Sequence, residues 1–342
     1  MKITVIGNFG YASGKLDGQT VKTRSLYTLL ETNSSLIKDL KYYDTSLLKN
    51  NKMLFFSLSK DVVTSDKIFY LPAQNSLRFF FPFLFVFCKI CNTKINYFVV
   101  GGWLKDLLTS HKYLQIMLSK IECIFSETYI IKKELEKSFK FKNVSYFPNF
   151  RSCYYSPTFN KVDVDSVRLV YVGRINENKG ISDLCLVLND LRKIGVVNFI
   201  IDLYGQVDSV YQEEFNILLE KFEFISYKGA LNPQEIYDVV GKYDLMLFPT
   251  KYYTEGLPGT VLDAYLSGVP VIGSGWKHSE EFIVNRVTGF IYGFNDLNGF
   301  KNLMIEILSD GSILNEMKIQ AWKKSREFAE DYALSILKKS LI

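Results

Sequence analysis

Cysteine is scarce in this 342-residue sequence and forms no recognisable framework. The chain has five cysteines, an odd number, and only Cys88 and Cys91 are close neighbours. No second cysteine pair and no histidine pair completes a zinc site with them. They also lie in an aromatic run, where a free thiol behaves as a small hydrophobic group. A disulfide scaffold is therefore excluded, and a zinc or redox role is disfavoured for Cys88, Cys91, Cys123, Cys153 and Cys185.

The sequence also lacks a recognisable targeting segment or membrane span. Residues 1–7 read as a strand, without the charged n-region, long apolar stretch and small-residue cleavage site of a signal peptide. The most apolar run, Leu77–Cys91, is about 15 residues long, whereas a membrane-spanning helix needs about 20. We therefore expect a cytoplasmic protein.

Two interpretations of Leu77–Cys91 stay open. The run is either a buried helix of the first domain or an interfacial element that dips into a membrane surface, here the cytoplasmic face of the inner membrane. Its basic neighbours would in the second case hold anionic lipid headgroups. Pro82 fits a bend or a first helical turn and does not decide between them.

Positive charge is concentrated in the first half of the chain. Residues 1–150 contain 21 Lys and Arg against 11 Asp and Glu, whereas the remainder contains 20 against 25. This asymmetry is typical of a first half that meets an anionic ligand or surface, although ordinary solvated lysines would also produce it.

A repeated alternation of strand and helix signals runs through the chain. Its length fits about two domains of roughly 150 residues each, and 48% apolar residues suffice for two cores. Alternating strands and helices predict parallel sheets with helices on both faces. In the first half we expect strands at Ile3–Ile6, Met53–Leu58, Ile95–Val100, Cys123–Phe125 and Val144–Phe147, with helices at Thr20–Leu30 and Tyr129–Phe139.

The second half repeats the alternation after a break at Pro148-Asn149 and a polar linker, Arg151–Asp165. We expect domains at residues 1–152 and 153–325, and a C-terminal helix at 326–342 that crosses back to the first domain. The expected strands are Arg168–Val172, Phe199–Tyr204, Ile225–Tyr227, Leu245–Phe248 and Val269–Gly273, and the expected helices are Gly180–Ile194, Tyr211–Lys221, Pro233–Tyr243, Leu257–Leu266 and Ile313–Leu341.

The first strand of the second half ends in a candidate phosphate site. Gly173 closes the strand and Gly180 opens the next helix, with Arg174 and Lys179 between them. A diphosphate here would meet a glycine that permits close approach, a guanidinium, an ammonium and a helix N-terminus. The carboxyl end of a strand is also where open α/β sheets bind ligands.

A second candidate segment follows the strand that ends at Pro249. Its glycine- and proline-rich turn places Glu255 at the mouth of a helix and Asp263 about two turns along that helix. Glu255 could accept hydrogen bonds from sugar hydroxyls, and Asp263 from a ribose. The alternative is a glutamate that stabilises the helix dipole and a solvated aspartate.

These segments resemble the motifs of glycosyltransferase family 4. Glu255 through Asp263 resembles its Glu-x7-Glu signature, and Arg174-x4-Lys179 is similar to its diphosphate clamp. The glycine-rich loop that holds Gly7, Gly10, Gly14 and Gly18, with the residues 17–23 after it, resembles the first-domain loop beside the donor phosphates and acceptor. Phe248–Gly289 resembles the same region of bacterial capsule and lipopolysaccharide transferases. The resemblance spans nearly the whole chain and implies an α/β, GT-B architecture: two Rossmann-like domains facing each other across a cleft.

The resemblance also implies roles for individual residues. The catalytic set would be Arg174, Lys179 and Glu255. The donor would further contact Gly18, Gly173, Tyr204, Gly205, Lys228, Gly229, Gly256, Leu257, Pro258 and Asp263. The acceptor side would contain Thr20, Lys22, Gly102, Trp103 and Asp106.

Two positions depart from the family pattern. Asp263 stands where the family commonly has glutamate, so the carboxylate is one methylene shorter. Many members have a first-domain histidine near the reacting sugar, but this sequence contains only His111 and His278. His111 is expected on a helix surface, and Asp106 or a backbone carbonyl near Gly102 is as plausible a neighbour of the sugar.

The missing histidine is compatible with the retaining mechanism that the resemblance implies. In front-face attack the leaving phosphate takes the acceptor proton, so a diphosphate clamp matters more than a protein base. Asp163-Val164-Asp165 fits the Asp-x-Asp with which the other large glycosyltransferase fold holds a divalent cation. It lies in the predicted linker, before a strand, and we interpret it as chance, with neither metal nor cofactor implied.

The sequence therefore predicts a retaining, metal-independent hexosyltransferase. It would move a sugar from a nucleoside-diphosphate sugar to a glycan or polyprenyl-linked oligosaccharide in surface polysaccharide synthesis, with no nucleic acid partner. The inner membrane surface is a further candidate partner. Two alternatives stay open: a sugar-nucleotide epimerase of the same fold, and a non-catalytic nucleotide-sugar-binding partner of a transferase complex.

Overall fold

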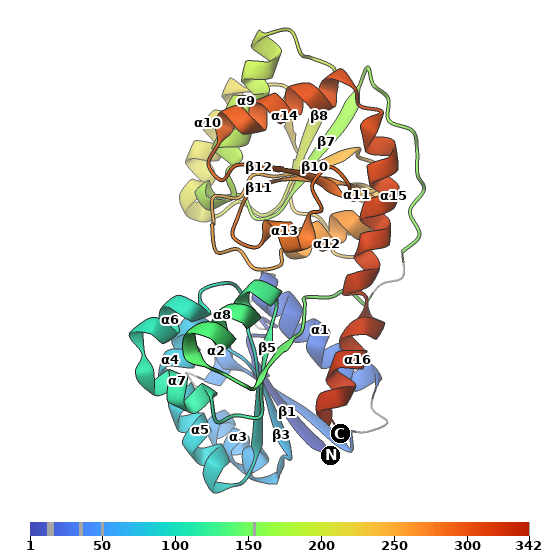
Figure 1. The fold of residues 1–342 in the computed structure, drawn as a ribbon. Helices are drawn as coiled ribbons and strands as arrows, with labels where there is room; N and C mark the ends of the chain where they lie inside the picture. Colours follow the sequence, from blue (N-terminus) through green and yellow to red (C-terminus); the bar gives the residue numbers. More distant parts are fainter. Residues whose placement is uncertain (12–16, 34–36, 49–50, 153–154, 342) are drawn as a thin grey trace. The chain divides into compact units, whose positions relative to one another are not determined.

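The computed structural model describes residues 1–11, 17–33, 37–48, 51–152 and 155–341. By their contacts the residues separate into two units: unit 1 contains Met1–Ser152 and Phe328–Ile342, and unit 2 contains Cys153–Glu327. Each unit is built on a six-stranded sheet whose paired strands are all parallel (Figure 1). The predicted parallel α/β architecture is thereby confirmed. Gly14 and Cys153 lie outside the described residues.

The sheet of unit 1 has the strand order β2-β1-β3-β4-β5-β6. Its strands are β1 (Lys2–Gly7), β2 (Asp39–Asp44), β3 (Lys67–Leu71), β4 (Lys94–Phe98), β5 (Cys123–Ser126) and β6 (Val144–Tyr146). Its helices are α1 (Gly18–Thr32), α2 (Thr45–Leu48), α3 (Lys52–Thr64), α4 (Gln74–Phe79), α5 (Phe81–Ile90), α6 (Leu104–Ser110), α7 (Lys112–Leu118), α8 (Tyr129–Phe139) and α16 (Glu330–Leu341).

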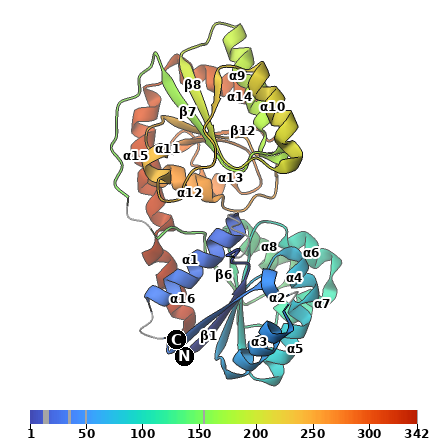
Figure 2. The ribbon, with the colours of Figure 1, turned by 180° about the vertical axis from the view of Figure 1, so that it is seen from behind.

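Helices cover both faces of this sheet. In two opposite views α1 and α16 lie on one side of the sheet, and α3, α5 and α7 lie on the other (Figures 1 and 2). The first face has a core that joins Leu26 and Leu29 of α1 to Leu337 of α16. The second core packs Leu58, Leu84 and other apolar side chains against the opposite side of the strands.

The predicted strand Met53–Leu58 is wrong, because these residues begin the helix α3. The Asn51 side chain accepts a hydrogen bond from the Leu54 backbone at 3.1 Å and caps the first turn. Leu58 and Val62, four residues apart, are buried, whereas Met53 is 85% exposed. A spacing of four on the buried face is the period of a helix, and the strand interpretation ignored it.

The apolar run Leu77–Cys91 forms two helices, α4 and α5, that meet at Phe80. Pro82 lies in the first turn of α5, where its missing N–H costs no hydrogen bond. Leu84 and Cys88 point into the core. The run therefore contributes buried positions to unit 1, and its other face is exposed to solvent. No helix among the described residues is both long and apolar enough to cross a membrane.

A buried ion pair joins three segments of unit 1. The Lys22 amine on α1 lies 2.6 Å from Glu127 Oε1 after β5, and it also donates to the Val99 carbonyl after β4 at 2.9 Å. The second Glu127 oxygen accepts from the Gly101 backbone at 3.1 Å. Burial lowers the pKa of the Lys22 amine, and the Glu127 carboxylate opposes that shift.

The sheet of unit 2 has the order β12-β11-β10-β7-β8-β9. Its strands are β7 (Val167–Val172), β8 (Phe199–Tyr204), β9 (Ile225–Tyr227), β10 (Leu245–Phe248), β11 (Val271–Ser274) and β12 (Gly289–Tyr292). Its helices are α9 (Ile181–Lys193), α10 (Gln212–Lys221), α11 (Ile236–Val240), α12 (Gly259–Leu266), α13 (Ser279–Phe282), α14 (Leu297–Ser309) and α15 (Ile313–Ser325), and the short 3₁₀ turns are η2 (Glu177–Lys179), η3 (Ser209–Tyr211) and η4 (Arg326–Phe328).

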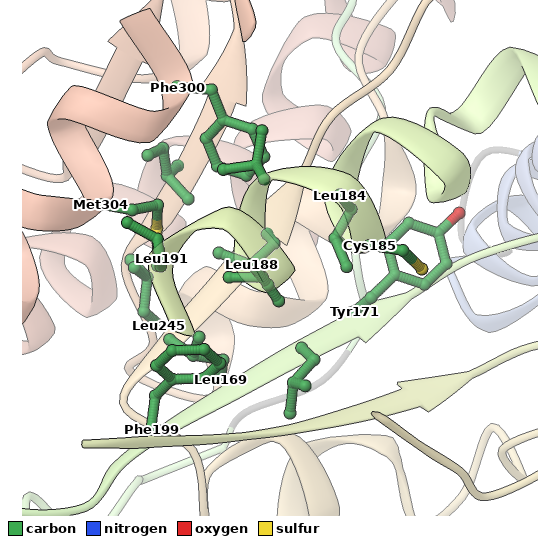
Figure 3. Packing of buried hydrophobic residues seen from close by; sticks show 14 of the residues in the cluster. Leu169, Tyr171, Leu184, Cys185, Leu188, Leu191, Phe199, Leu245, Phe300 and Met304 are labelled. Carbon is green, nitrogen blue, oxygen red and sulfur yellow. The ribbon is translucent and has the colours of Figure 1, made fainter. Parts of the chain in front are cut away.

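The main core of unit 2 lies between its sheet and the helices α9 and α14. Leu188 and Leu191 of α9 point toward Leu169 and Leu245 of the strands, and Met304 of α14 closes the cluster (Figure 3). These side chains are almost fully buried. The apolar spacing on α9 thus fixes the helix over the strand that precedes the candidate phosphate loop.

Truncating Leu188 should weaken this core. Leu188→Ala removes a fully buried side chain, and we expect a loss of about 2–5 kcal/mol in the free energy of unfolding. Leu186 on the same helix is 43% exposed, so Leu186→Ala should cost less than about 0.5 kcal/mol. Urea unfolding followed by circular dichroism measures both, and equal losses would contradict the packing described.

Breaking the buried pair of unit 1 should also destabilise the protein. Lys22→Met leaves Glu127 buried without its cation, and we expect a loss of about 3–5 kcal/mol in unfolding free energy. The more accessible pair of Lys105 with Glu134, 2.9 Å apart and with side chains 40% and 18% exposed, provides a control, because Lys105→Met should cost at most about 1 kcal/mol.

A second substitution separates charge from packing. Lys22→Met combined with Glu127→Gln removes the unpaired charge and keeps an acceptor for the Gly101 backbone. Urea unfolding should show the double variant to be more stable than Lys22→Met alone. If the double variant is no more stable than Lys22→Met alone, the unpaired Glu127 charge is not the cause of the loss.

Candidate functional site

The candidate site of unit 2 lies where the strand order reverses. From β7 the chain proceeds outward through β8 and β9, whereas β10, β11 and β12 build the sheet in the other direction. The loops after β7 and β10 therefore lie side by side at the carboxyl edge of the sheet. In open α/β sheets this switch point is the preferred place for a ligand.

Two glycines bring the loops of this edge into backbone contact. A Cβ on Gly180 would lie 2.0 Å from the Pro249 carbonyl oxygen, and Gly180 has a left-handed φ of 71°. A Cβ on Gly205, after β8, would lie 1.7 Å from the Gly173 carbonyl oxygen. Only glycine fits at either position, so the loops after β7, β8 and β10 are held together without intervening side chains.

The two motifs predicted from the sequence meet directly in this site. The Lys179 amine, at the end of η2, lies 2.5 Å from Glu255 Oε2 in the loop before α12. The buried Thr250 hydroxyl lies 3.4 Å from the same oxygen. Lys251 donates its backbone N–H to the Asn178 carbonyl at 2.9 Å, which fixes the loops beside the pair. Lys179 and Glu255 are still 23% and 19% exposed, so a ligand can reach both.

Arg174 occupies the other end of the β7 loop. Its Nε lies 3.6 Å from Asp208 Oδ1, and its side chain is 40% exposed. The buried Tyr171 hydroxyl donates to the Arg174 carbonyl at 2.7 Å and fixes the backbone that carries the guanidinium. Asn176 donates to the other Asp208 oxygen at 2.8 Å. Each cation of the predicted clamp is thus paired with a carboxylate and accessible from solvent.

Asp208 was missed from the sequence. It stands four residues after β8, at the same sheet edge as Arg174. Arg174 was placed at this edge because parallel strands share their carboxyl ends. The same argument places Asp208 there, but it requires knowing that β8 neighbours β7.

The α12 N-terminus opens beside Glu255. The helix begins at Gly259, two residues later than predicted. Pro258 holds the N-cap position, and within the described part of the chain no side-chain hydrogen bond caps the helix there. Its first N–H groups therefore lack helical partners, as at every helix start. Gly256, Leu257 and Pro258 are buried in the turn before it.

Asp263, on the second turn of α12, is 6% exposed. The alternative of a solvated aspartate is wrong, because Asp263 is almost fully buried.

The residues predicted to border the base lie at the ends of β8 and β9. The Tyr204 and Tyr243 hydroxyls are 3.0 Å apart, and Tyr243 donates to Asp202 at 2.6 Å. Burial, with the Asp202 hydrogen bond, raises the pKa of Tyr243 above its usual range. Lys228 lies 3.6 Å from Asp202. The backbone of Gly229 accepts from Gly205 at 2.9 Å, which joins these strand ends.

In unit 1 the predicted acceptor residues divide into buried and accessible ones. Thr20 is fully buried, caps α1 together with Asp17, and accepts the Asp17 backbone N–H at 2.9 Å. Lys22 is 1% exposed and bound to Glu127, so its amine organises the loops and cannot bind an acceptor directly. Gly18, which was predicted to contact the donor, is exposed at the start of α1.

The turn before α6 holds the other predicted acceptor residues. Gly102 is buried, Trp103 is partly buried and precedes α6, and Asp106 is exposed in its first turn. His111 lies between α6 and α7, where its Nδ1 is 2.9 Å from the Leu107 carbonyl. The expectation of a histidine on a helix surface is therefore wrong, because His111 lies in the turn between two helices and is partly buried.

Candidate metal positions lie away from these sites. Asp163 and Asp165 form an exposed turn before β7, at the end of the strand opposite to Arg174. No group of three or more histidine, cysteine or acidic side chains within the described residues is arranged to hold a metal ion. Burial raises the pKa of the Cys88 thiol to about 12, so little thiolate is present at neutral pH.

Comparison with known proteins finds matches mainly for unit 2. Residues 158–324 match the family model of glycosyl transferases group 1. The chain is 26% identical over 183 residues to an uncharacterized 41.2 kDa protein in the cps region of Klebsiella pneumoniae, covering 53% of this chain and 45% of that protein. It is 24% identical over 157 residues to the capsular polysaccharide biosynthesis glycosyltransferase CapM of Staphylococcus aureus, covering 45% and 40%. The chain thus matches less than half the length of these curated relatives.

Solved structures match the chain over its full length. Anabaena Alr3699/HepE in complex with UDP and glucose aligns with a TM-score of 0.78 at 13% identity, covering 100% of this chain and 99% of that one. Sucrose-phosphate synthase from Thermosynechococcus elongatus aligns with a TM-score of 0.78 at 14% identity, covering 99% and 98%. At such identities the likeness shows the fold alone. The chain therefore has the GT-B fold, and residues 158–324 of its second unit are similar to the group 1 glycosyl transferases.

Proposed function

We propose that this protein is a retaining glycosyltransferase that moves a sugar from a nucleoside-diphosphate sugar to a glycan acceptor. The observation that carries the proposal is the contact between Lys179 and Glu255 at the switch point of a group 1 domain. It places one cation and one carboxylate at the same accessible edge of the sheet. A nucleotide sugar as donor is also supported by the HepE structure, which contains UDP and glucose.

The two cations supply the charge that a leaving diphosphate requires. Arg174 offers a planar guanidinium and Lys179 a mobile ammonium, and the uncapped start of α12 adds backbone N–H groups. As the bond from the sugar C1 to the phosphate oxygen breaks, negative charge builds on the diphosphate and these groups offset it. This charge compensation is our reason to propose transfer without a metal.

Glu255 has a different role in this proposal. In the free protein it accepts the hydrogen bond of Lys179. A bound diphosphate competes for that amine, which leaves Glu255 as an acceptor for sugar hydroxyls. Asp263 lies on the second turn of α12 and is almost fully buried, and we assign it to the ribose.

The proposed retention of configuration at the sugar C1 depends on which group accepts the acceptor's proton. The acceptor oxygen attacks C1 from the face that the phosphate leaves, and its proton passes to the departing phosphate oxygen. No protein base is required for that step, and His111, which is held at the Leu107 carbonyl, is not assigned one.

We further propose that the protein acts in the cytoplasm and that its acceptor is a lipid-linked oligosaccharide of surface polysaccharide synthesis. Support comes from the basic first half of the chain and from the relatives: CapM is a capsular polysaccharide enzyme, and a third match, 21% identical over 168 residues, is the alpha-galactosylglucosyldiacylglycerol synthase of Streptococcus pneumoniae. That match covers 49% of this chain and 43% of the synthase.

Nucleotide sugars should stabilise the protein against heat. A donor present at 100 times its Kd should raise the free energy of unfolding by about 2.7 kcal/mol, because it binds only the folded state. Thermal shift with a panel of nucleotide sugars measures this, with free sugars as the control. If no nucleotide raises the Tm, donor binding is contradicted.

Removing the Lys179 amine should abolish turnover without unfolding the chain. Lys179→Ala should lower kcat/KM for release of the nucleoside diphosphate by at least about 100-fold, the size of a lost charge-stabilising contact. Lys193→Ala, at the far end of α9 and 67% exposed, is the matched control and should leave turnover unchanged. Coupled detection of released nucleotide provides the rates, and circular dichroism verifies the fold.

The products distinguish the alternatives. Transfer gives a glycosylated acceptor and a free nucleoside diphosphate in equal amounts. Rearranged nucleotide sugar without release would indicate an epimerase, and binding without release would indicate a non-catalytic partner. Unchanged turnover by Lys179→Ala would remove Lys179 from the site.

A further inference from the structure

An apolar strip on the surface of unit 1 is unused by the proposed reaction. It follows α5, where Phe83, Val86 and Ile90 are 74%, 51% and 77% exposed. These positions are three and four residues apart, so they form one stripe on the helix. Their neighbours Leu84 and Cys88 occupy the opposite, buried stripe. The helix is thus apolar on both faces, and only one face has a partner within the described residues.

The strip continues onto the neighbouring helix. A shallow groove of about 300 Å³ lies between α5 and α7. Ile116 of α7 and Phe79 of α4 extend the exposed apolar area, at 58% and 61% exposure. The side chains that line the groove are Pro82, Phe83, Val86, Phe87, Ile90 and Met117. We call Phe79, Phe83, Val86, Ile90 and Ile116 the apolar strip.

The charges around the apolar strip have one sign. On α4, α5 and α7 the charged residues are Arg78, Lys89 and Lys112, all exposed, and these helices contain no acidic residue. Lys120 follows directly after α7 and is exposed too. Asp106 on α6, which is exposed, is the single aspartate or glutamate in residues 74–120.

This combination limits what can cover the apolar strip. Two copies of the chain that met through it would bring equal positive charges together, which is unfavourable. A lipid bilayer with anionic headgroups satisfies both features: its acyl boundary takes up the apolar side chains, and each lysine or arginine near the surface contributes about 1 kcal/mol.

We propose that α4, α5 and α7 dock on the surface of an anionic lipid bilayer. The helix α5 lies in the plane of the interface, with Phe83, Val86 and Ile90 at the boundary of headgroups and acyl chains. Arg78, on α4, and the lysines of α5 and α7 contact the lipid phosphates. This docking goes beyond the transfer reaction, because it requires neither donor nor acceptor.

Flotation with vesicles tests the docking. The full-length protein should float with vesicles of phosphatidylcholine and phosphatidylglycerol, and much less with phosphatidylcholine alone. The variant with Phe83→Ser, Val86→Ser and Ile90→Ser should bind anionic vesicles at least about tenfold more weakly, because the inserted apolar area is lost. These side chains are exposed, so the Tm of the variant should remain close to that of the original chain.

A matched triple variant controls for a general loss of surface apolar groups. Ile200, Val210 and Ile217 of unit 2 are 48%, 96% and 57% exposed, and their replacement by serine should leave flotation unchanged. Replacing Arg78, Lys89 and Lys112 by glutamine should weaken binding to anionic vesicles and remove most of its salt dependence.

Three outcomes would overturn the docking. The first is that the original chain stays out of the vesicle fraction, and the second is that the serine variant of α5 floats as well as the original. The third is a dimer in sedimentation equilibrium that the same variant converts to a monomer, which would make the apolar strip an interface between copies. Thermal shift with nucleotide sugars should be equal for all variants, so failure of the docking is distinguishable from failure of the proposed transfer.

Discussion

The site of unit 2 depends on the contact between two backbones, at Gly180 and Pro249. Because a Cβ at residue 180 would overlap the Pro249 carbonyl, the loops after β7 and β10 can approach only through glycine. That approach brings Lys179 and Glu255, which are 76 residues apart, into one ion pair. The sheet supplies the rest of the constraint, since parallel strands direct all their carboxyl ends to the same edge.

In unit 1 the segments at the carboxyl edge of the sheet are held together by an ion pair. Its sheet also reverses direction, between β1 and β3, and the segments at its carboxyl edge are joined by Lys22 and Glu127. Moving a charged pair from water into the protein interior costs free energy. Here each partner also makes a further hydrogen bond: the Lys22 amine donates to the Val99 carbonyl, and the Glu127 carboxylate accepts from the Gly101 backbone. Backbone contact in one unit and a buried ion pair in the other each hold the segments of that edge together.

Local signals in the sequence were sufficient for most strands and for the clamp loops, but β2, β3 and β12 were missed. β8, β9 and β10 have the predicted bounds because each is a short apolar run between turn residues. The edge strands β2 and β12 have a neighbour on one side only, and β2 is largely polar. The central strand β3 was missed because the apolar run Met53–Leu58 was interpreted as the strand of that segment. Glu127 and Asp208 were missed because their partners, Lys22 and Arg174, lie far away in the sequence, and spacing alone cannot reveal a long-range pair.

The position of α16 determines the order in which the chain can be completed during synthesis. Leu337 of this helix belongs to the same core as Leu26 of α1, yet all of unit 2 is translated between them. A ribosome therefore releases every residue of unit 2 before unit 1 receives its last helix. The nascent unit 1 exposes the apolar face that α16 later covers, and it is there that a chaperone would have the longest access to the unfinished protein.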